Sequence, residues 1–185
     1  MNSFLTDAGA LIIQVVFGLY ILAVLLRFLF QLVRADFYNP VSQFLVALTN
    51  PLLKPLRRVI PGLFGIDLAS VLLLLALKGL EIFLIFLLNG YALETLPMLI
   101  AAATELVRLT INVFFYAILM RAILSWFMPY GINQNPAGGL LVSLTEPLMR
   151  PARRLIPAVG GLDLSPIVVL VGLQLLQLAL SHLLH

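Results

Sequence analysis

The chain has no cysteine and little charge. Without cysteine it can form neither disulfides nor thiolate metal sites, and it has no cysteine nucleophile. Only 10% of its 185 residues are charged, whereas 62% are hydrophobic. Soluble domains are about half apolar and about a quarter charged. A chain with so few charged side chains cannot cover a water-facing surface, and the composition therefore predicts a membrane protein.

Catalytic motifs are also missing from the sequence. It contains no glycine-rich phosphate loop, no HExxH and no GxSxG, and no serine has a suitably placed histidine. The net charge of +3 would fit nucleic acid, but in so apolar a chain it indicates topology and contact with anionic lipid headgroups. We therefore expect no catalytic activity, no metal ion, no cofactor and no nucleic-acid partner.

Four apolar stretches are long enough to cross a bilayer, which takes about 20 helical residues. They are predicted at about residues 10–33, 68–89, within 98–128, and at 164–184. The third is longer than a bilayer requires, so either it tilts strongly or its first turns lie at the interface. No positive residue precedes the first stretch and no cleavage site follows it, so we expect it to be retained.

Lysine and arginine are absent from both tails and from the connector between the second and third spans. Seven cations lie instead in the two other connections: Arg34, Lys54, Arg57 and Arg58 in one, and Arg150, Arg153 and Arg154 in the other. The positive-inside rule therefore predicts that both basic loops are cytoplasmic and that both termini lie outside.

One phrase occurs twice. Residues 48–61 read LTNPLLKPLRRVIP and residues 144–157 read LTEPLMRPARRLIP. The alignment extends without a gap over residues 39–68 and 135–164, at an offset of 96, with 16 of 30 positions identical. The identities fall on prolines, arginines, glycine and aspartate, which shared apolarity does not explain.

The repeat extends into the spans. Upstream of the phrase the offset becomes 94, which pairs Arg27 with Arg121. Each copy, residues 1–96 and 97–185, then holds a span, a basic loop and a span. Because two spans return the chain to the same side, the copies are predicted to be parallel around an axis along the membrane normal. The predicted fold is an all-α membrane protein with four transmembrane helices, built as this tandem repeat.

Each basic loop is predicted to form two short amphipathic helices at the cytoplasmic interface. Asn39-Pro40 starts the first helix, Pro51 stops it and starts the second, and Pro61 ends the second. The cations Lys54, Arg57 and Arg58 share one face of the second helix, as do Arg150, Arg153 and Arg154 in the other copy. Three interpretations of these segments remain open: lipid anchors, a platform for a cytoplasmic partner or an anion, and re-entrant loops. Three cations per loop argue against deep insertion.

An aspartate stands just before the second and the fourth span. Asp67 and Asp163 are predicted to cap these helices, with a salt bridge to the nearby arginine pair as a further possibility. Pro166 has no N–H, so Asp163 is expected to accept from Ser165.

Ionisable groups also lie inside the predicted spans, where a charge costs about 2.5–3.5 kcal/mol on the insertion scale. Lys78 and Glu81 can offset each other at i and i+3 on the second span, and the repeat pairs them with Gln174 and Gln177. These four groups are expected to face the bundle interior, as an ion or solute path or as a structural polar clamp. Glu105 and Arg108 repeat the i, i+3 spacing on the third span. Arg27 and Arg121 lie about two turns from the cytoplasmic ends of their spans, where they can snorkel, and they therefore indicate less about function.

The doubled pattern NP…LT-x-P-L-x-[KR]-P-x-R-R-x-[IL]-P…G-x-D-L-[AS]-[SP] resembles the YggT family of small bacterial membrane proteins. The resemblance covers both halves, from about Tyr20 and from Phe114 onward. The first copy departs from the family pattern at Ala69-Ser70, where the second copy has the commoner Ser165-Pro166. It implies a bacterial inner-membrane protein with no defined catalytic residue.

The resemblance also implies a range of roles. Some family members are linked with osmotic tolerance and potassium uptake. Plastid and cyanobacterial relatives are linked with haem attachment to a cytochrome b-type subunit and with nucleoid distribution. Gram-positive relatives are encoded among cell-division genes. We therefore expect a part in ion and osmotic homeostasis, as a channel-like or regulatory membrane subunit that could form a homo-oligomer. The alternative is a scaffold or assembly factor that recruits a partner through the basic loops, in cofactor assembly or cell division.

Overall fold

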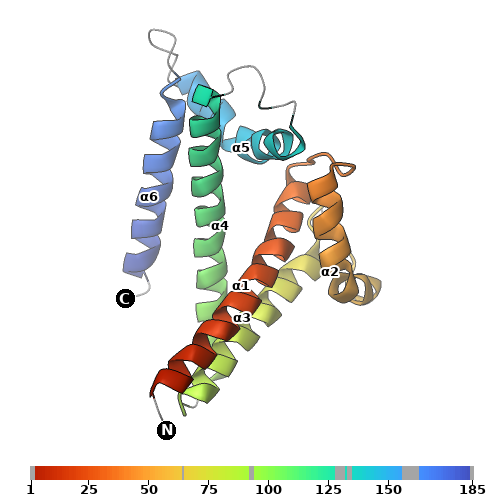
Figure 1. The fold of residues 1–185 in the computed structure, drawn as a ribbon, viewed down its shortest axis with the longest axis vertical. Coiled ribbons are helices and arrows are strands. Elements are labelled where there is room, and N and C mark those ends of the chain that lie inside the picture. Colours follow the sequence, from red (N-terminus) through yellow and green to blue (C-terminus); the bar gives the residue numbers. More distant parts are fainter. Residues whose placement is uncertain are drawn as a thin grey trace. The chain divides into compact units, whose positions relative to one another are not determined.

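The computed structural model describes residues 3–63, 65–91, 94–127, 132, 135–155 and 163–183. Apart from one isolated bridge between Leu63 and Ile66, the regular structure of these residues is helical, which confirms the all-α fold class. Figure 1 shows the helices, which in chain order are α1 (Ser3–Leu32), α2 (Pro40–Val59), α3 (Leu68–Leu88), α4 (Thr95–Phe127), α5 (Pro136–Leu155) and α6 (Ser165–Leu183).

Four of these helices, α1, α3, α4 and α6, are long and apolar enough to cross a membrane, as predicted. Only 6–22% of each span's most apolar window is buried inside the protein, so most of its apolar surface is left for lipid to cover. Two starts differ from the prediction: α1 begins at Ser3 and α4 at Thr95. Helix α4 includes Pro97 because a proline is tolerated in the first turn, where N–H groups lack intrahelical partners. The predicted span ends Met128 and Leu184 lie outside the described residues.

The prediction of two short helices per loop was wrong. Each loop forms one helix of 20 residues, α2 or α5, that continues through two prolines. Each proline removes one intrahelical hydrogen bond and clashes with the carbonyl four residues earlier, which bends a helix without ending it where packing holds both sides. Figure 1 shows both helices bent. Leu45, Thr49 and Leu53, spaced four residues apart, are the buried stripe that holds α2 across Pro51.

The starts of α2 and α5 are capped alike. The Asn39 side chain accepts a hydrogen bond from Val41 N at 3.0 Å, and the Asn135 side chain accepts one from Ala137 N at 3.1 Å. In both helices proline occupies the first position, where its missing N–H costs nothing. Pro157, which the repeat predicts to end the second basic helix, lies outside the described residues.

A tight turn returns the chain from α2 to α3. Leu63 and Ile66 exchange backbone hydrogen bonds of 2.9 and 3.1 Å. Gly65 within the turn has φ +83°, a conformation that glycine adopts without the steric cost of a side chain. The turn brings Asp67, at the start of α3, back to the last turn of α2.

The chain divides into two compact units. The first contains Met1–Phe28 and Gln43–Leu109, and the second contains Leu29–Ser42 and Thr110–His185, so α1, α2 and α4 contribute to both. In the first unit, a Cβ on Gly9 would lie 3.5 Å from Leu88, which places the start of α1 against the end of α3. In the second unit, α5 packs against α6. The predicted repeat boundary between residues 96 and 97 and the parallel arrangement of the copies stay predictions.

Candidate functional site

In the first unit, α1 is joined to α2 by a buried arginine. Arg27, with only 8% of its surface exposed, donates through Nη1 to Thr49 Oγ1 at 2.6 Å and to Val46 O at 3.4 Å. Thr49 is fully buried, and its hydroxyl donates to Leu45 O at 2.6 Å. The threonine is therefore held by its own helix and presents an oxygen lone pair to the guanidinium.

The second unit repeats this contact between α4 and α5. Arg121 Nη1 donates to Thr145 Oγ1 at 2.7 Å and to Val142 O at 3.5 Å, and the Thr145 hydroxyl donates to Leu141 O at 2.8 Å. Sequence reasoning, which noted only that Arg27 and Arg121 can snorkel, missed these contacts. Both guanidinium groups turn instead into the contact between a span and its basic helix, because a buried hydroxyl and a carbonyl accept their hydrogen bonds there.

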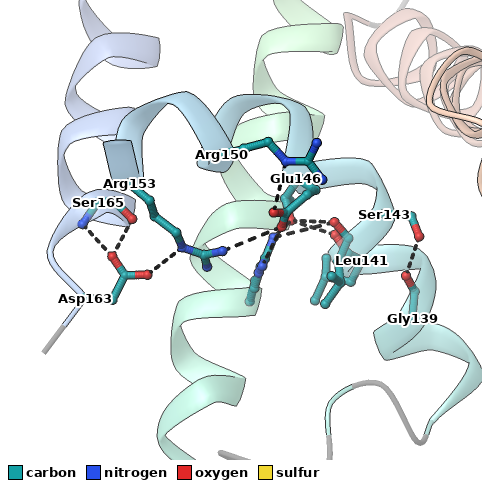
Figure 2. A network of polar contacts seen from close by, with 11 residues as sticks. Gly139, Leu141, Ser143, Glu146, Arg150, Arg153, Asp163 and Ser165 are labelled. Atoms are coloured by element: carbon teal, nitrogen blue, oxygen red, sulfur yellow. Dashed lines mark hydrogen bonds and ion pairs between the residues drawn. The ribbon is translucent and has the colours of Figure 1, made fainter. Parts of the chain in front are cut away.

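A carboxylate completes the second copy. Glu146 Oε2 accepts from Arg121 Nη2 at 2.9 Å. The same carboxylate lies 3.9 Å from Arg150 Nε and 3.7 Å from Arg153 Nη1. Figure 2 shows Glu146 between Arg150 and Arg153, with Arg153 reaching Asp163 on its other side. In the first copy the position of Glu146 is occupied by Asn50.

The two predicted aspartates lie where the sequence placed them. Asp67 accepts from the backbone N–H of Ser70 at 3.4 Å and from the Ser70 hydroxyl, and it forms an ion pair with Arg57. Asp67 thus caps α3 and ties that helix to the last turn of α2.

The second aspartate makes the corresponding set of contacts. Asp163 accepts from Ser165 N at 3.0 Å and from the Ser165 hydroxyl, and its Oδ2 lies 2.9 Å from Arg153 Nε. The use of Ser165 agrees with the expectation drawn from Pro166. In each copy, one of the three cations of the basic helix therefore pairs with an aspartate at the start of the next span.

These contacts change the titration of both aspartates. Burial by itself would raise the pKa of Asp67, but hydrogen bonds from Arg57 and Ser70 outweigh it, and the pKa lies below its usual value. Burial by itself would also raise the pKa of Asp163, but hydrogen bonds from Ser165 and Arg153 outweigh this effect, and the pKa lies below its usual value. A carboxylate whose pKa is lowered by folding stabilises the protein above its unfolded pKa, and this contribution is lost as the pH falls through the folded pKa.

We therefore expect the protein in detergent to lose thermal stability as the pH falls below about 4, the ordinary aspartate pKa. The measurement is the melting temperature between pH 7 and pH 3, for the wild type and for Asp67→Asn/Asp163→Asn. The double variant should melt lower at pH 7 and lose less on acidification, because the carboxylates are gone. Parallel curves for the two proteins would show that these aspartates do not couple folding to pH.

The other loop cations are exposed. Lys54, Arg58 and Arg154 make no ion pair with any described residue. Arg150 is 68% exposed despite its contact with Glu146. The basic helices thus present cations at their surface while one arginine of each is fixed in place.

The predicted polar groups of the spans fall into separate contacts. Lys78 Nζ lies 3.0 Å from Glu81 Oε2 on α3, and the side chains are 19% and 6% exposed, so this pair is largely buried within its own unit. In the other unit, the Gln177 amide on α6 donates to Asn112 Oδ1 on α4, a partner that sequence reasoning missed. Gln174 is exposed in its unit. The predicted meeting of Lys78 and Glu81 with the two glutamines stays a prediction.

The remaining pair on α4 is looser. Glu105 Oε1 and Arg108 Nη1 lie 3.6 Å apart, with side chains 45% and 39% exposed.

The asparagine-proline motifs of the two loops meet in the second unit. Asn39 Nδ2 donates to Pro136 O at 2.7 Å. Around this contact lies an open cleft of about 380 Å³, lined by Asp36, Tyr38, Asn39, Pro40, Asn135, Pro136, Gly139, Leu140 and Ser143. Asn39 thus both caps the first turn of α2 and bonds the start of α5, and both contacts lie within the second unit.

The amino-acid sequence is similar to those of known proteins along most of its length. The family described as CCB3/YggT matches residues 6–88 and again residues 100–184. The chain belongs to the CCB3/YggT family. It is 46% identical to an uncharacterized protein of Pseudomonas aeruginosa over 176 residues, covering 94% of this chain and 88% of that protein.

Two other CCB3/YggT relatives are similar over comparable lengths. An uncharacterized protein of Vibrio alginolyticus is 41% identical, covering 91% of this chain and 90% of that protein. The uncharacterized protein YggT of Escherichia coli K12 is 36% identical, covering 94% and 89%. No solved structure matches the chain. The double match of the family coincides with the two copies of the sequence repeat, and the protein is a membrane protein of this family.

Proposed function

We propose that this CCB3/YggT protein is a non-enzymatic protein of the bacterial inner membrane that contributes to ion and osmotic homeostasis. It would act as a channel-like or regulatory membrane subunit, with potassium as the first ion to test. The observation that carries the proposal is the Lys78–Glu81 ion pair at 3.0 Å within the apolar helix α3. Ionisable groups inside a span are costly and mark ion or proton paths by default. Four spans leave little room for a pore, so we propose that conduction uses a homo-oligomer.

A second candidate function is favoured by the basic helices. The exposed cations Lys54, Arg58 and Arg154 would recruit an acidic cytoplasmic or membrane partner, in cofactor assembly or cell division. The ion pairs Arg57–Asp67 and Arg153–Asp163 would hold each helix in position for this purpose. In this scaffold role the Lys78–Glu81 pair would serve only to hold the helices together.

One set of variants distinguishes the two candidates in cells. A strain without the protein is complemented with the wild type, with Lys78→Leu/Glu81→Leu, or with Lys54→Gln/Arg58→Gln/Arg154→Gln, and growth is followed after an osmotic upshift in limiting potassium. Homeostasis through α3 predicts failure of the α3 variant alone. Failure of the loop variant alone, at equal membrane levels, would overturn this proposal in favour of partner recruitment.

We propose the orientation given by the positive-inside rule, with cytoplasmic basic helices and both termini outside. The chain lacks cysteine, so single cysteines report the side directly. An impermeant thiol reagent added to intact cells should label Glu94→Cys and should reach Arg58→Cys only after permeabilisation. The reverse labelling pattern would show that the basic helices lie outside and would contradict the proposed orientation.

A further inference from the structure

The two copies of the repeat differ in one place that matters for charge. Glu146 in α5 corresponds to Asn50 in α2. In the second copy the carboxylate faces the guanidinium of Arg121 and the cations of Arg150 and Arg153. The corresponding three cations of the first copy are Arg27, Lys54 and Arg57; Lys54 and Arg57 keep the same spacings from Asn50, and Arg27 is two residues nearer in the sequence.

The arginine contacts match atom by atom except at this carboxylate. Nη1 donates to a threonine hydroxyl and to a valine carbonyl in both copies, at 2.6 and 3.4 Å for Arg27 and at 2.7 and 3.5 Å for Arg121. Nη2 of Arg121 donates to Glu146 at 2.9 Å. Among the described residues, Nη2 of Arg27 has no acceptor and no carboxylate lies within 4 Å of its guanidinium.

The first copy therefore holds a buried cation that pairs with no carboxylate among the described residues. Arg27 is 8% exposed, and removing a guanidinium from water is costly unless a charge-assisted hydrogen bond replaces the lost hydration. Among the described residues of the first copy, Arg57 pairs with Asp67 while Arg27 and Lys54 have no ion pair, whereas the second copy has both Glu146 and Asp163 as carboxylate partners.

The place of the missing carboxylate is reachable from outside. Glu146 is 31% exposed in the second copy, and Asn50 is partly exposed in the first. The Asn50 side chain is one methylene shorter than glutamate and makes no hydrogen bond to Arg27 among the described residues. Lys54 is exposed one turn further along α2.

We propose that the first copy binds a phosphate-type anion between Arg27, Asn50 and Lys54, in the position that the Glu146 carboxylate occupies in the second copy. The anion is either the headgroup of an anionic phospholipid or free phosphate, since a phosphate oxygen accepts from a guanidinium as a carboxylate does. The site depends on neither ion conduction nor partner recruitment.

Exchanging the two residues tests the proposal. Asn50→Glu supplies the first copy with its own carboxylate and should exclude the anion, whereas Glu146→Asn should create a second site around Arg121. Both variants leave Lys54, Arg57, Arg150 and Arg153 in place, so the general attraction of the basic helices for anions changes by only one charge.

Two arms distinguish the source of the anion. In the first, delipidated protein in neutral detergent is titrated with inorganic phosphate, with chloride at equal ionic strength as the control, and the melting temperature is followed. In the second, native mass spectrometry counts phosphatidylglycerol molecules retained from mixed micelles with phosphatidylcholine. We expect one tightly held anion in the wild type, at least tenfold weaker binding in Asn50→Glu, and two anions in Glu146→Asn, in whichever arm corresponds to the natural ligand.

Equal binding by the wild type and Asn50→Glu in both arms would overturn the proposal. Failure of Asn50→Glu to fold would also overturn it, because the first copy is proposed to accept an anion at this point. The gain of a site in Glu146→Asn is a separate measurement on a second variant, and its absence at normal folding would contradict the equivalence of the two copies.

Discussion

Replacing Lys78 alone with leucine should destabilise the protein by about 3–5 kcal/mol. The Glu81 side chain is 6% exposed, and its carboxylate bonds Lys78 Nζ through both oxygens, at 3.0 and 3.1 Å. Without the lysine, a charge would stay buried in an apolar helix with no partner. Thermal denaturation in detergent, supported by denaturant unfolding for the free energy, measures the loss.

The double variant Lys78→Leu/Glu81→Leu should be at least as stable as the wild type. Replacing a buried ion pair with apolar side chains removes the desolvation cost together with the attraction, and the result is often neutral or stabilising by about 1–4 kcal/mol. Arg150→Gln serves as the control, since its ion pair is exposed and should be worth less than about 1 kcal/mol. Equal losses in the single and double variants would show that Glu81 is not stabilised by Lys78.

The second large effect is expected at Thr49. Valine has nearly the same shape but offers no acceptor, so Thr49→Val leaves Arg27 with a single weak acceptor at Val46. A hydrogen bond to a charged group contributes about 1.5–3 kcal/mol. We expect a loss of this size in the free energy of unfolding, measured in the same assay.

The repeat supplies a matched comparison for Thr49. Thr145→Val should cost less than Thr49→Val, because Arg121 keeps its ion pair with Glu146 at 2.9 Å. Thr49→Ser keeps the hydroxyl and should lose only the packing of one methyl group, about 1 kcal/mol. If Thr145→Val were the more damaging change, the carboxylate of the second copy would not support its arginine as described.

Features that depend on local spacing were predictable from the sequence. Apolar runs placed the four spans, i and i+3 spacing paired Lys78 with Glu81, and the missing N–H of Pro166 directed Asp163 to Ser165. A span is one continuous helix, and the two contacts each lie within about one helical turn. They can therefore be predicted without knowing how the chain bends.

Contacts across the basic helices were not predictable in the same way. Arg27 and Thr49 are 22 residues apart, and they meet because the chain turns between α1 and α2, which the spacing of residues along one helix does not give. The sequence did contain a signal, since Arg27/Arg121 and Thr49/Thr145 are identical pairs. The arginine pair is aligned at an offset of 94 and the threonine pair at an offset of 96. This difference hid the fact that each arginine contacts the threonine of its own copy. The missing carboxylate at Asn50 became visible only once that contact was known.

The most direct test of the proposed function is potassium flux into liposomes that contain the purified protein, with Lys78→Leu/Glu81→Leu beside it. Because the double variant is expected to fold, its result reports on the pair and not on unfolding. The account predicts flux above that of protein-free liposomes for the wild type and its loss in the variant. Wild-type flux that the variant retains in full, or no flux in either protein, would contradict a conducting role for the polar face of α3.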